Sequence, residues 1–378
     1  MNVPFLNLRK EFAFIKKDLK AGLKDLFSTQ HWILSEKVAE FEQQASRFLG
    51  CSHALGVSSG TDALVLALRA VAIQRFKKQF FSPDDEIIVP SFTFVASAES
   101  VIRAGGRPVF VDVDPNTFNM SPRALESVVT AKTKGIIVVH LFGLSAPMDE
   151  ITSFARRHNL FIIEDCAQSF GAKADAGHYT GTLGDCGCFS FFPTKNLGAF
   201  GDAGMITAKD EAVYKVLRAL RNHGGEDKYN IEYIGYNARL DAIQAQVLSA
   251  KLKHLPAFLE ARRRIAEFYA ANLHSLERDI KLPSMHALHT FNQYTIRVLY
   301  KKRDALKEYL AKKGIVTQVY YPAALHTMNV FAAYTAPKQL PVTEQLMEEV
   351  LSLPIGPTLH QRAQEYVVRY IQKFFGKK

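Results

Sequence analysis

The sequence has little cysteine and almost no tryptophan. Among 378 residues there are one tryptophan and four cysteines, Cys51, Cys166, Cys186 and Cys188. The spacing of Cys186 and Cys188 has no matching second pair, which argues against a zinc module. Thiols without a disulfide pattern are typical of a protein from a reducing compartment, so we expect these cysteines to be reduced.

Long hydrophobic runs are also missing. No uninterrupted apolar stretch reaches the roughly 20 residues that a bilayer span needs. The N-terminal residues MNVPFLNLRKEF lack the basic-then-apolar pattern of a secretion signal. We therefore expect a cytoplasmic protein with no membrane partner.

The charge is unbalanced but spread out. The formal net charge is +10, from 47 Lys and Arg against 37 Asp and Glu, which favours an anionic partner. The basic residues occur as pairs and triplets on several predicted helices, as on solvated helix faces. This distribution predicts no nucleic-acid partner.

Short apolar runs alternate with helical patterns through the first two thirds of the chain. Such a rhythm predicts an α/β fold with a largely parallel sheet covered by helices on both faces. Ligands bind such sheets at the carboxyl ends of the strands. The predicted strands are 86–92, 108–114, 135–143, 160–166, 186–192 and 204–208, and the polar residues expected near their ends are Ser91, Asp112, His140, Asp165 and Ser190.

The pattern changes near residue 255, where Pro256 interrupts a long helical stretch. We predict a large domain over 1–255, with an N-terminal helical segment, and a smaller C-terminal α+β domain over 256–378. The helices expected are 8–28, 36–48, 61–71, 95–105, 148–159, 239–274, 303–314, 343–351 and 360–375, and the strands expected in the smaller domain are 290–299 and 314–320.

Three segments carry groups with chemical potential. GVSSGTDALVLAL (56–68) places glycine before a helix, either as a phosphate cradle or as ordinary capping. LFIIEDCAQSFGA (160–172) ends a buried strand in Asp165, which needs a cation or strong donors unless it lies at the surface. FSFFPTKNLGAFGDAG (189–204) holds Lys195, either a solvated cation or an amine activated by desolvation. Together they suit pyridoxal 5′-phosphate, which needs an amine, a carboxylate for its ring nitrogen and an anion site.

These segments also resemble a known family. SSGTDAL, VPSFTFVASAESV, VFVDVDPNTFNM, HLFGLSAPMDEI, IIEDCAQSFGA, FSFFPTKNLGAFGDAG and IGYNARLDAIQAQVL follow one another as in the DegT/StrS family of nucleotide-sugar aminotransferases. The resemblance runs over nearly the whole chain. It implies the aspartate aminotransferase-like fold, fold type I, with a mostly parallel seven-stranded sheet, and pyridoxal phosphate as cofactor.

The resemblance implies roles for the residues around the cofactor ring. Lys195 resembles the catalytic lysine that binds the cofactor as a Schiff base and then transfers protons as general acid and base. Asp165 resembles the partner of the pyridinium nitrogen, and Gln168 resembles the contact to the ring hydroxyl. Phe94 occupies the position of an aromatic ring stacked on the cofactor, and its alternative is a simple core residue.

The resemblance also implies a phosphate site that is shared between subunits. Gly60, Thr61 and Ser190 resemble its ligands within the chain. Asn237, in GYNAR, resembles an asparagine that reaches the phosphate from the other subunit, and its alternative is a simple turn residue. The implied assembly is a homodimer with a shared active site.

The substrate residues are less well defined by the sequence. Arg239 could pair with the carboxylate of an amino donor, and Tyr321 and His326 could contact a sugar, but a structural role is as good an interpretation for each. The implied reaction moves an amino group from glutamate to the 3- or 4-keto group of a nucleotide-diphosphate-linked deoxy sugar. The alternatives are a dehydratase or lyase, whose relatives carry histidine at the lysine position, and a non-catalytic regulatory protein.

Two segments depart from the family pattern. The connection 70–86 is longer and more basic than expected, and we predict a surface excursion there. Ser35 stands where a glycine is usual, which bears on substrate preference more than on reaction type.

Overall fold

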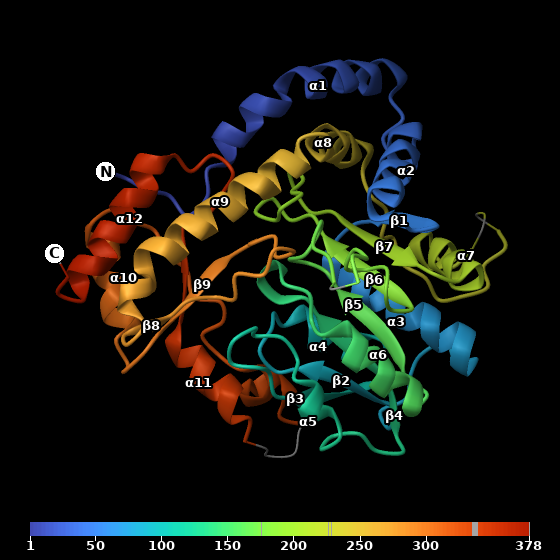
Figure 1. Cartoon of the computed structure of the whole chain (residues 1–378). Helices are drawn as coiled ribbons and strands as arrows, with labels where there is room; N and C mark the ends of the chain where they lie inside the picture. Colours follow the sequence, from blue (N-terminus) through green and yellow to red (C-terminus); the bar gives the residue numbers. More distant parts are fainter. Residues whose placement is uncertain (175, 226, 228, 335–338, 378) are drawn as a thin grey trace.

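A seven-stranded sheet forms the centre of the computed structural model, which describes all residues except 175, 226, 228, 335–338 and 378 (Figure 1). The strand order is β1-β7-β6-β5-β4-β2-β3. Only β7 runs antiparallel to its neighbours, so the predicted mostly parallel seven-stranded sheet is confirmed. The strands are β1 (His53–Val57), β2 (Glu86–Pro90), β3 (Arg107–Val111), β4 (Thr133–Val139), β5 (Phe161–Asp165), β6 (Cys186–Ser190) and β7 (Gly204–Ala208).

Helices cover both faces of this sheet, because successive strand residues point to opposite sides. Ile87 and Val89 of β2 pack with the first group of helices, whereas Ile88 packs with the second. The first group is α3 (Gly60–Phe76), α4 (Ala96–Arg103) and α7 (Glu211–Arg221); the other face carries α2 (Glu36–Leu49), α5 (Pro122–Leu125), α6 (Met148–Arg157) and α8 (Ala242–Leu252). Within the described part of the chain, no helix is both long and apolar enough to cross a membrane.

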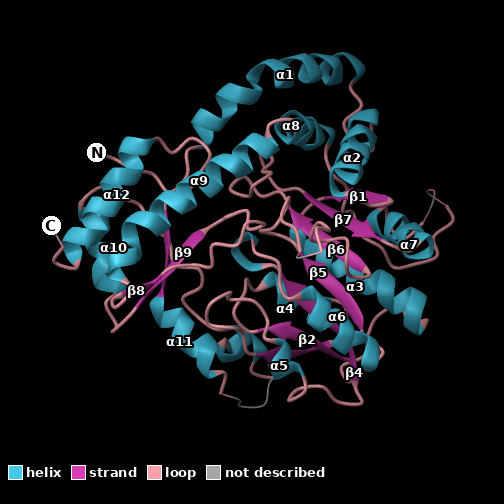
Figure 2. Ribbon diagram, viewed as in Figure 1, coloured by secondary structure: helices cyan, strands magenta, loops and turns pink. Residues whose placement is uncertain are grey.

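A second, smaller sheet has the order β10-β9-β8 and packs with the C-terminal helices (Figure 2). Its strands are β8 (Ile280–Lys281), β9 (Tyr294–Val298) and β10 (Val350–Leu353), and its helices are α9 (Leu255–Leu273), α10 (Arg303–Lys312) and α12 (Gln361–Phe374). In the chain, α11 (Pro341–Glu349) comes between α10 and α12 and packs against β9. The N-terminal helix α1 (Leu8–Thr29) packs along α8.

The predicted boundary near residue 255 coincides with the start of α9, where Pro256 occupies the first helical turn. Residues on each side of this boundary also pack into the hydrophobic core of the other part. Val3 lies in the hydrophobic core of the smaller sheet, and Leu325 and Phe331 lie in the core of the larger one. The division at 255 therefore stays a prediction.

Several sequence predictions of local structure were wrong or incomplete. The helix predicted over 239–274 is two helices, α8 and α9, which are separated at residues 253 and 254. The run 314–320 is not a strand: Ile315 and Gln318 form only isolated bridges, to Val3 and Ser352, because the segment meets two different partners. The helix predicted over 343–351 ends at Glu349 and continues as β10. The sequence pattern also did not reveal β1, which is five residues long and pairs with β7, far away in the sequence.

Candidate active site

A cavity of about 600 Å³ opens at the carboxyl edge of the large sheet. Its walls come from the ends of β4, β5 and β6, the start of α3 and the segment 319–321. Eight of the residues singled out from the sequence line it: Gly60, Thr61, Phe94, Asp165, Gln168, Ser190, Lys195 and Tyr321. The size lies within the usual range for small-molecule sites.

The start of α3 forms one end of the cavity. Ser59 caps the helix by accepting a hydrogen bond from the N–H of Asp62, 3.0 Å away. The backbone N–H groups of Gly60 and Thr61 lie in the first turn, where no intrahelical acceptor exists and the helix dipole favours an anion. A Cβ on Gly60 would lie 2.6 Å from the Cβ of Ser190, so glycine lets α3 approach the end of β6. The free N–H groups and the open space beside Gly60 are chemically suited to an anion.

Lys195 lies on a tight turn after β6. Its backbone N–H donates to the carbonyl of Phe192 at 2.9 Å, and the backbone N–H of Ala199 donates to the carbonyl of Phe191 at 2.8 Å. Burial lowers the pKa of Lys195 from 10.5 to about 8, although the nearby charge of Asp165 acts in the opposite direction. About a tenth of the amine is therefore uncharged at pH 7, far more than for an ordinary lysine, as a nucleophile requires.

Asp165 ends β5 and is buried. Its Oδ2 accepts from the Ser97 hydroxyl at 2.7 Å, and its Oδ1 accepts from the N–H of Ala167 at 3.1 Å. Burial raises the pKa of Asp165, and these hydrogen bonds, together with the charge of Lys195, offset part of that rise. A cationic N–H in the cavity would stabilise the ionised carboxylate further.

Gln168 and Tyr321 form a hydrogen-bonded pair in the cavity wall. Gln168 accepts from the N–H of Phe142 at 2.7 Å and donates to the Tyr321 hydroxyl at 3.0 Å. The ring of Tyr321 lies 6.2 Å from that of Phe94, whose side chain is 56% exposed. Phe94 therefore presents an open aromatic surface at the cavity mouth rather than filling the core.

Three predicted residues do not line the cavity of their own chain. Asn237 is exposed and pairs with Asn222 as an isolated bridge. Arg239 donates to the Asn222 side chain at 3.3 Å, and its buried Nε has no acceptor among the described residues.

His326 holds two segments together away from the cavity. Its Nδ1 is 2.7 Å from the Ser91 hydroxyl, and its Nε2 is 3.2 Å from Glu344. This geometry ties the end of β2 to α11. Asp112 also holds α11 in place, because its carboxylate accepts from the N–H groups of Val342 and Thr343 at the start of that helix.

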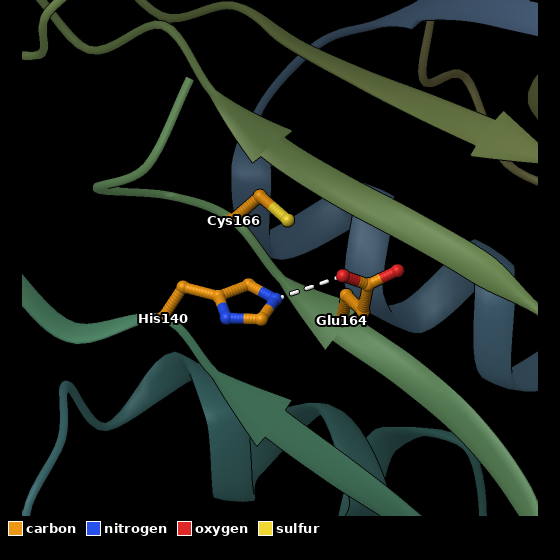
Figure 3. A group of neighbouring side chains, drawn as sticks. All are labelled: His140, Glu164 and Cys166. Atoms are coloured by element: carbon orange, nitrogen blue, oxygen red, sulfur yellow. Dashed lines mark hydrogen bonds and ion pairs between the residues drawn. The ribbon is translucent and has the colours of Figure 1, made fainter. Parts of the chain in front are cut away.

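His140, Glu164 and Cys166 lie together at the ends of β4 and β5, with ligand atoms within 4.8 Å of one another, close enough for a single metal ion (Figure 3). His140 accepts from the N–H of Ala146 at its Nδ1, so its Nε2 carries the proton and donates to Glu164 at 2.8 Å. The ligand atoms of His140 are thus already engaged. The group has the geometry of a hydrogen-bonded structural network.

Glu164 holds the turn at residues 181–184, between β5 and β6, by hydrogen bonds. Its carboxylate accepts from the N–H groups of Gly181, Leu183 and Gly184 at 2.6–2.8 Å, besides His140. Burial alone would raise the pKa of Glu164, but the hydrogen bonds from His140 and from the backbone lower it below its usual value.

Ser97 is a residue beside the site that the sequence did not reveal. It lies on α4, one turn beyond Phe94, and its hydroxyl contacts Asp165 directly. A serine in a helical pattern carries no distinguishing local signal. Only the pairing of α4 with the end of β5 in three dimensions identifies it.

Comparison with known proteins gives relatives over the full length. One, from Geobacillus stearothermophilus, is called a pleiotropic regulatory protein and is 42% identical over 379 residues, 99% of both chains. Another, from Acidithiobacillus ferrooxidans, is called UDP-N-acetyl-3-dehydro-α-D-glucosamine 3-aminotransferase and is 43% identical over 361 residues, 95% of this chain and 94% of the relative.

A solved structure and a family model agree with these relatives. NtdA from Bacillus subtilis, crystallised with bound cofactor PMP, matches with a TM-score of 0.91 and 30% identity, over 98% of this chain and 85% of the other. The family model described as DegT/DnrJ/EryC1/StrS aminotransferase family matches residues 14–372. The chain belongs to the DegT/DnrJ/EryC1/StrS aminotransferase family.

Proposed function

We propose that the protein is a pyridoxal phosphate-dependent aminotransferase that moves an amino group from glutamate to the 3- or 4-keto group of a nucleotide-diphosphate-linked deoxy sugar. One observation carries the proposal: Lys195, Asp165 and the anion site at the start of α3 line a single cavity. The family membership and the sugar aminotransferase named among the relatives support it.

The cavity fits the cofactor chemically. The phosphate would bind the N–H groups of Gly60 and Thr61 and the hydroxyl of Ser190, in the space that a Cβ on Gly60 would fill. The ring would stack on the open face of Phe94 and meet Asp165 at its nitrogen. The cofactor named in the related NtdA structure is the amino form of the same group.

When bound, pyridoxal phosphate supplies an electron sink for carbanion chemistry at the carbon that carries the amine. Asp165 would hold the proton on the ring nitrogen, because a buried carboxylate is stabilised by a cationic partner. Lys195, with its pKa near 8, would move a proton between the substrate carbon and the C4′ carbon of the cofactor in each half-reaction, as general acid and base.

Gln168 and Tyr321, which are hydrogen-bonded to each other in the cavity wall, would orient the cofactor and the sugar substrate. Gln168 keeps its amide fixed between Phe142 and Tyr321, and we propose that it contacts the ring hydroxyl. Burial raises the pKa of Tyr321 well above its usual value, so its hydroxyl stays protonated and can donate to a sugar oxygen.

The exposed position of Asn237 supports the proposed homodimer. Asn237 and its neighbour Arg239 do not line the cavity of their own chain, so in this proposal they complete the site of the partner subunit. Asn237 would bind the phosphate, and Arg239 the carboxylate of glutamate. His326 stays a candidate sugar contact, although its ring is already held by Ser91 and Glu344.

Two other functions are disfavoured by the same site. A lyase of this scaffold is expected to carry histidine in place of Lys195. A purely regulatory protein, as the name of the Geobacillus relative suggests for that protein, would have no use for an amine whose pKa is lowered beside a buried carboxylate. We propose catalysis in the cytoplasm.

The test begins with the absorbance of the purified protein. We expect a yellow protein whose visible band, typical of lysine-bound cofactor, changes when glutamate is added. Lys195→Ala should remove the band. Product formation is then measured in the reverse direction with a panel of nucleotide-linked 3-amino and 4-amino sugars. An unchanged band in Lys195→Ala would refute the assignment, and inertness toward the whole panel would refute the substrate class.

A further inference from the structure

The basic excursion between α3 and β2 is fastened by a fully buried arginine. Arg69 lies on α3 and is 0% exposed. Its guanidinium donates to the backbone carbonyl and side-chain oxygen of Gln79, to the hydroxyl of Tyr236 at 2.8 Å and to the carbonyl of Ile234 at 3.0 Å. The ring of Phe80 covers its outer face, with the Cζ 3.5 Å from the ring centroid.

Arg69 therefore joins two segments that are about 155 residues apart in sequence. Gln79 extends the connection, because its side-chain amide donates to the carbonyl of Glu232 at 3.3 Å and accepts from the N–H of Ile234 at 3.4 Å. The side chain thus bonds to alternate residues of the segment 232–236 as a neighbouring strand would. On the other side, Phe81 is buried in the core of the large sheet, so the excursion is anchored.

The fastened segment leads directly to Asn237. Tyr236 is further fixed by its backbone, since its N–H donates to Leu220 at 2.8 Å and its carbonyl accepts from His223 at 2.9 Å. Ala238 is fixed to the end of β1 through the N–H of Ser58 at 3.1 Å. Asn237 itself is exposed between these two held neighbours.

A structural role in packing alone does not account for the choice of arginine. Among the residues that the structure describes, no carboxylate is a hydrogen-bond partner of Arg69, and burying a cation without a counter-charge is costly. An apolar side chain would fill the space at lower cost. The planar guanidinium, however, can hold several acceptors in one fixed geometry, which neither lysine nor an apolar residue can do.

We propose that Arg69 is a positioning residue that, with Gln79, sets the placement of the segment 232–237 and hence of Asn237 at the phosphate of the partner subunit. The inference rests on the proposed function, because it takes the phosphate as the ligand of Asn237. The proposal also gives a role to residues 77–81 of the basic connection. Within them, Gln79 accepts hydrogen bonds from Arg69 and Phe80 covers its guanidinium, and we call these two residues with Arg69 the clamp.

The experiment compares Arg69→Gln, Asn237→Ala and the double variant in the full-length dimer. Arg75→Gln is the matched control, because Arg75 lies on the same helix but binds Asn159 instead of the segment 232–236. Gln79→Ala, on the exposed side of the clamp, covers the case in which Arg69→Gln does not fold. Two quantities are measured: hydrogen exchange of the peptide that contains 232–237, and the dissociation constant of pyridoxal phosphate.

We expect Arg69→Gln and Gln79→Ala to speed exchange in 232–237, with Arg75→Gln unchanged. Asn237→Ala should raise the cofactor dissociation constant about tenfold, Arg69→Gln about three- to tenfold, and the double variant no more than Asn237→Ala, because both remove one contact. Unchanged exchange in both clamp variants, or additive effects in the double variant, overturns the inference. Normal cofactor binding by Asn237→Ala refutes the proposed role of Asn237, and the link from Arg69 to the cofactor falls with it.

Discussion

The amine of Lys195 should react with electrophiles near neutral pH in the cofactor-free protein. Burial lowers its pKa from 10.5 to about 8. At pH 7.5, a pKa of 8 leaves about a quarter of the amine uncharged, against about 0.1% for an unperturbed lysine. The environment therefore increases the reactive fraction roughly 200-fold.

The assay is brief acylation over a range of pH, followed by mass spectrometry of the peptide that contains Lys195. Lys215, whose side chain is 64% exposed, serves as an internal reference. The labelling midpoint of Lys195 is expected near pH 8.

Asp165→Asn sharpens the test, because the amide oxygen can still accept from Ser97 or Ala167 while the charge is removed. The Asp165 carboxylate raises the pKa of Lys195, so its loss should move the labelling midpoint to lower pH. A midpoint above about pH 10 in the wild-type chain would refute the desolvation argument. An upward shift in the variant would refute the electrostatic link to Asp165.

Three further predictions follow from the same geometry. Gly60→Ala places a Cβ 2.6 Å from that of Ser190 and should weaken pyridoxal phosphate binding about tenfold or more by titration, whereas wild-type affinity would contradict the anion site. Ser97→Ala removes a donor to Asp165, so the pKa of Asp165 should rise and the acid limb of the kcat–pH profile should move to higher pH; an unmoved limb would separate Asp165 from the chemistry. In the cofactor-free chain, Lys195→Met should increase the free energy of unfolding by up to about 3 kcal/mol below pH 8, because the wild-type fold must bury this amine in its charged form there. That gain should fade between pH 8 and 10.5, as the unfolded chain also loses the proton, and a gain that does not vary with pH would exclude titration as its cause.

The site residues at strand ends were predictable because parallel strands end at one edge. Asp165 and Ser190 close neighbouring strands, β5 and β6, and Lys195 follows on the next turn. The position at a strand end alone did not identify which polar residues line the cavity. Ser91 contacts His326, and Asp112 accepts a hydrogen bond from the start of α11, so neither residue serves the cavity. Which strand end serves the cavity depends on tertiary neighbours that no local pattern specifies.

The remaining elements depend on long-range pairing. The short strand β1 exists because β7 pairs with it, and β10 exists because β9 does; neither has a strong pattern of its own. Ser97 became recognisable only through its contact with Asp165, and Arg69 only through its contacts with Gln79 and Tyr236. Residues that act across the fold are therefore the ones that sequence reasoning missed.

The contact between Gly204 and the start of α3 has a consequence for the stability of the folded chain. A Cβ on Gly204 would lie 2.3 Å from the carbonyl oxygen of Ser59, so glycine at this position lets β7 lie against the start of α3. Under the proposed function, pyridoxal phosphate bound beside this contact would also stabilise the folded chain, by about 2.7 kcal/mol at a free concentration of 100 times its dissociation constant.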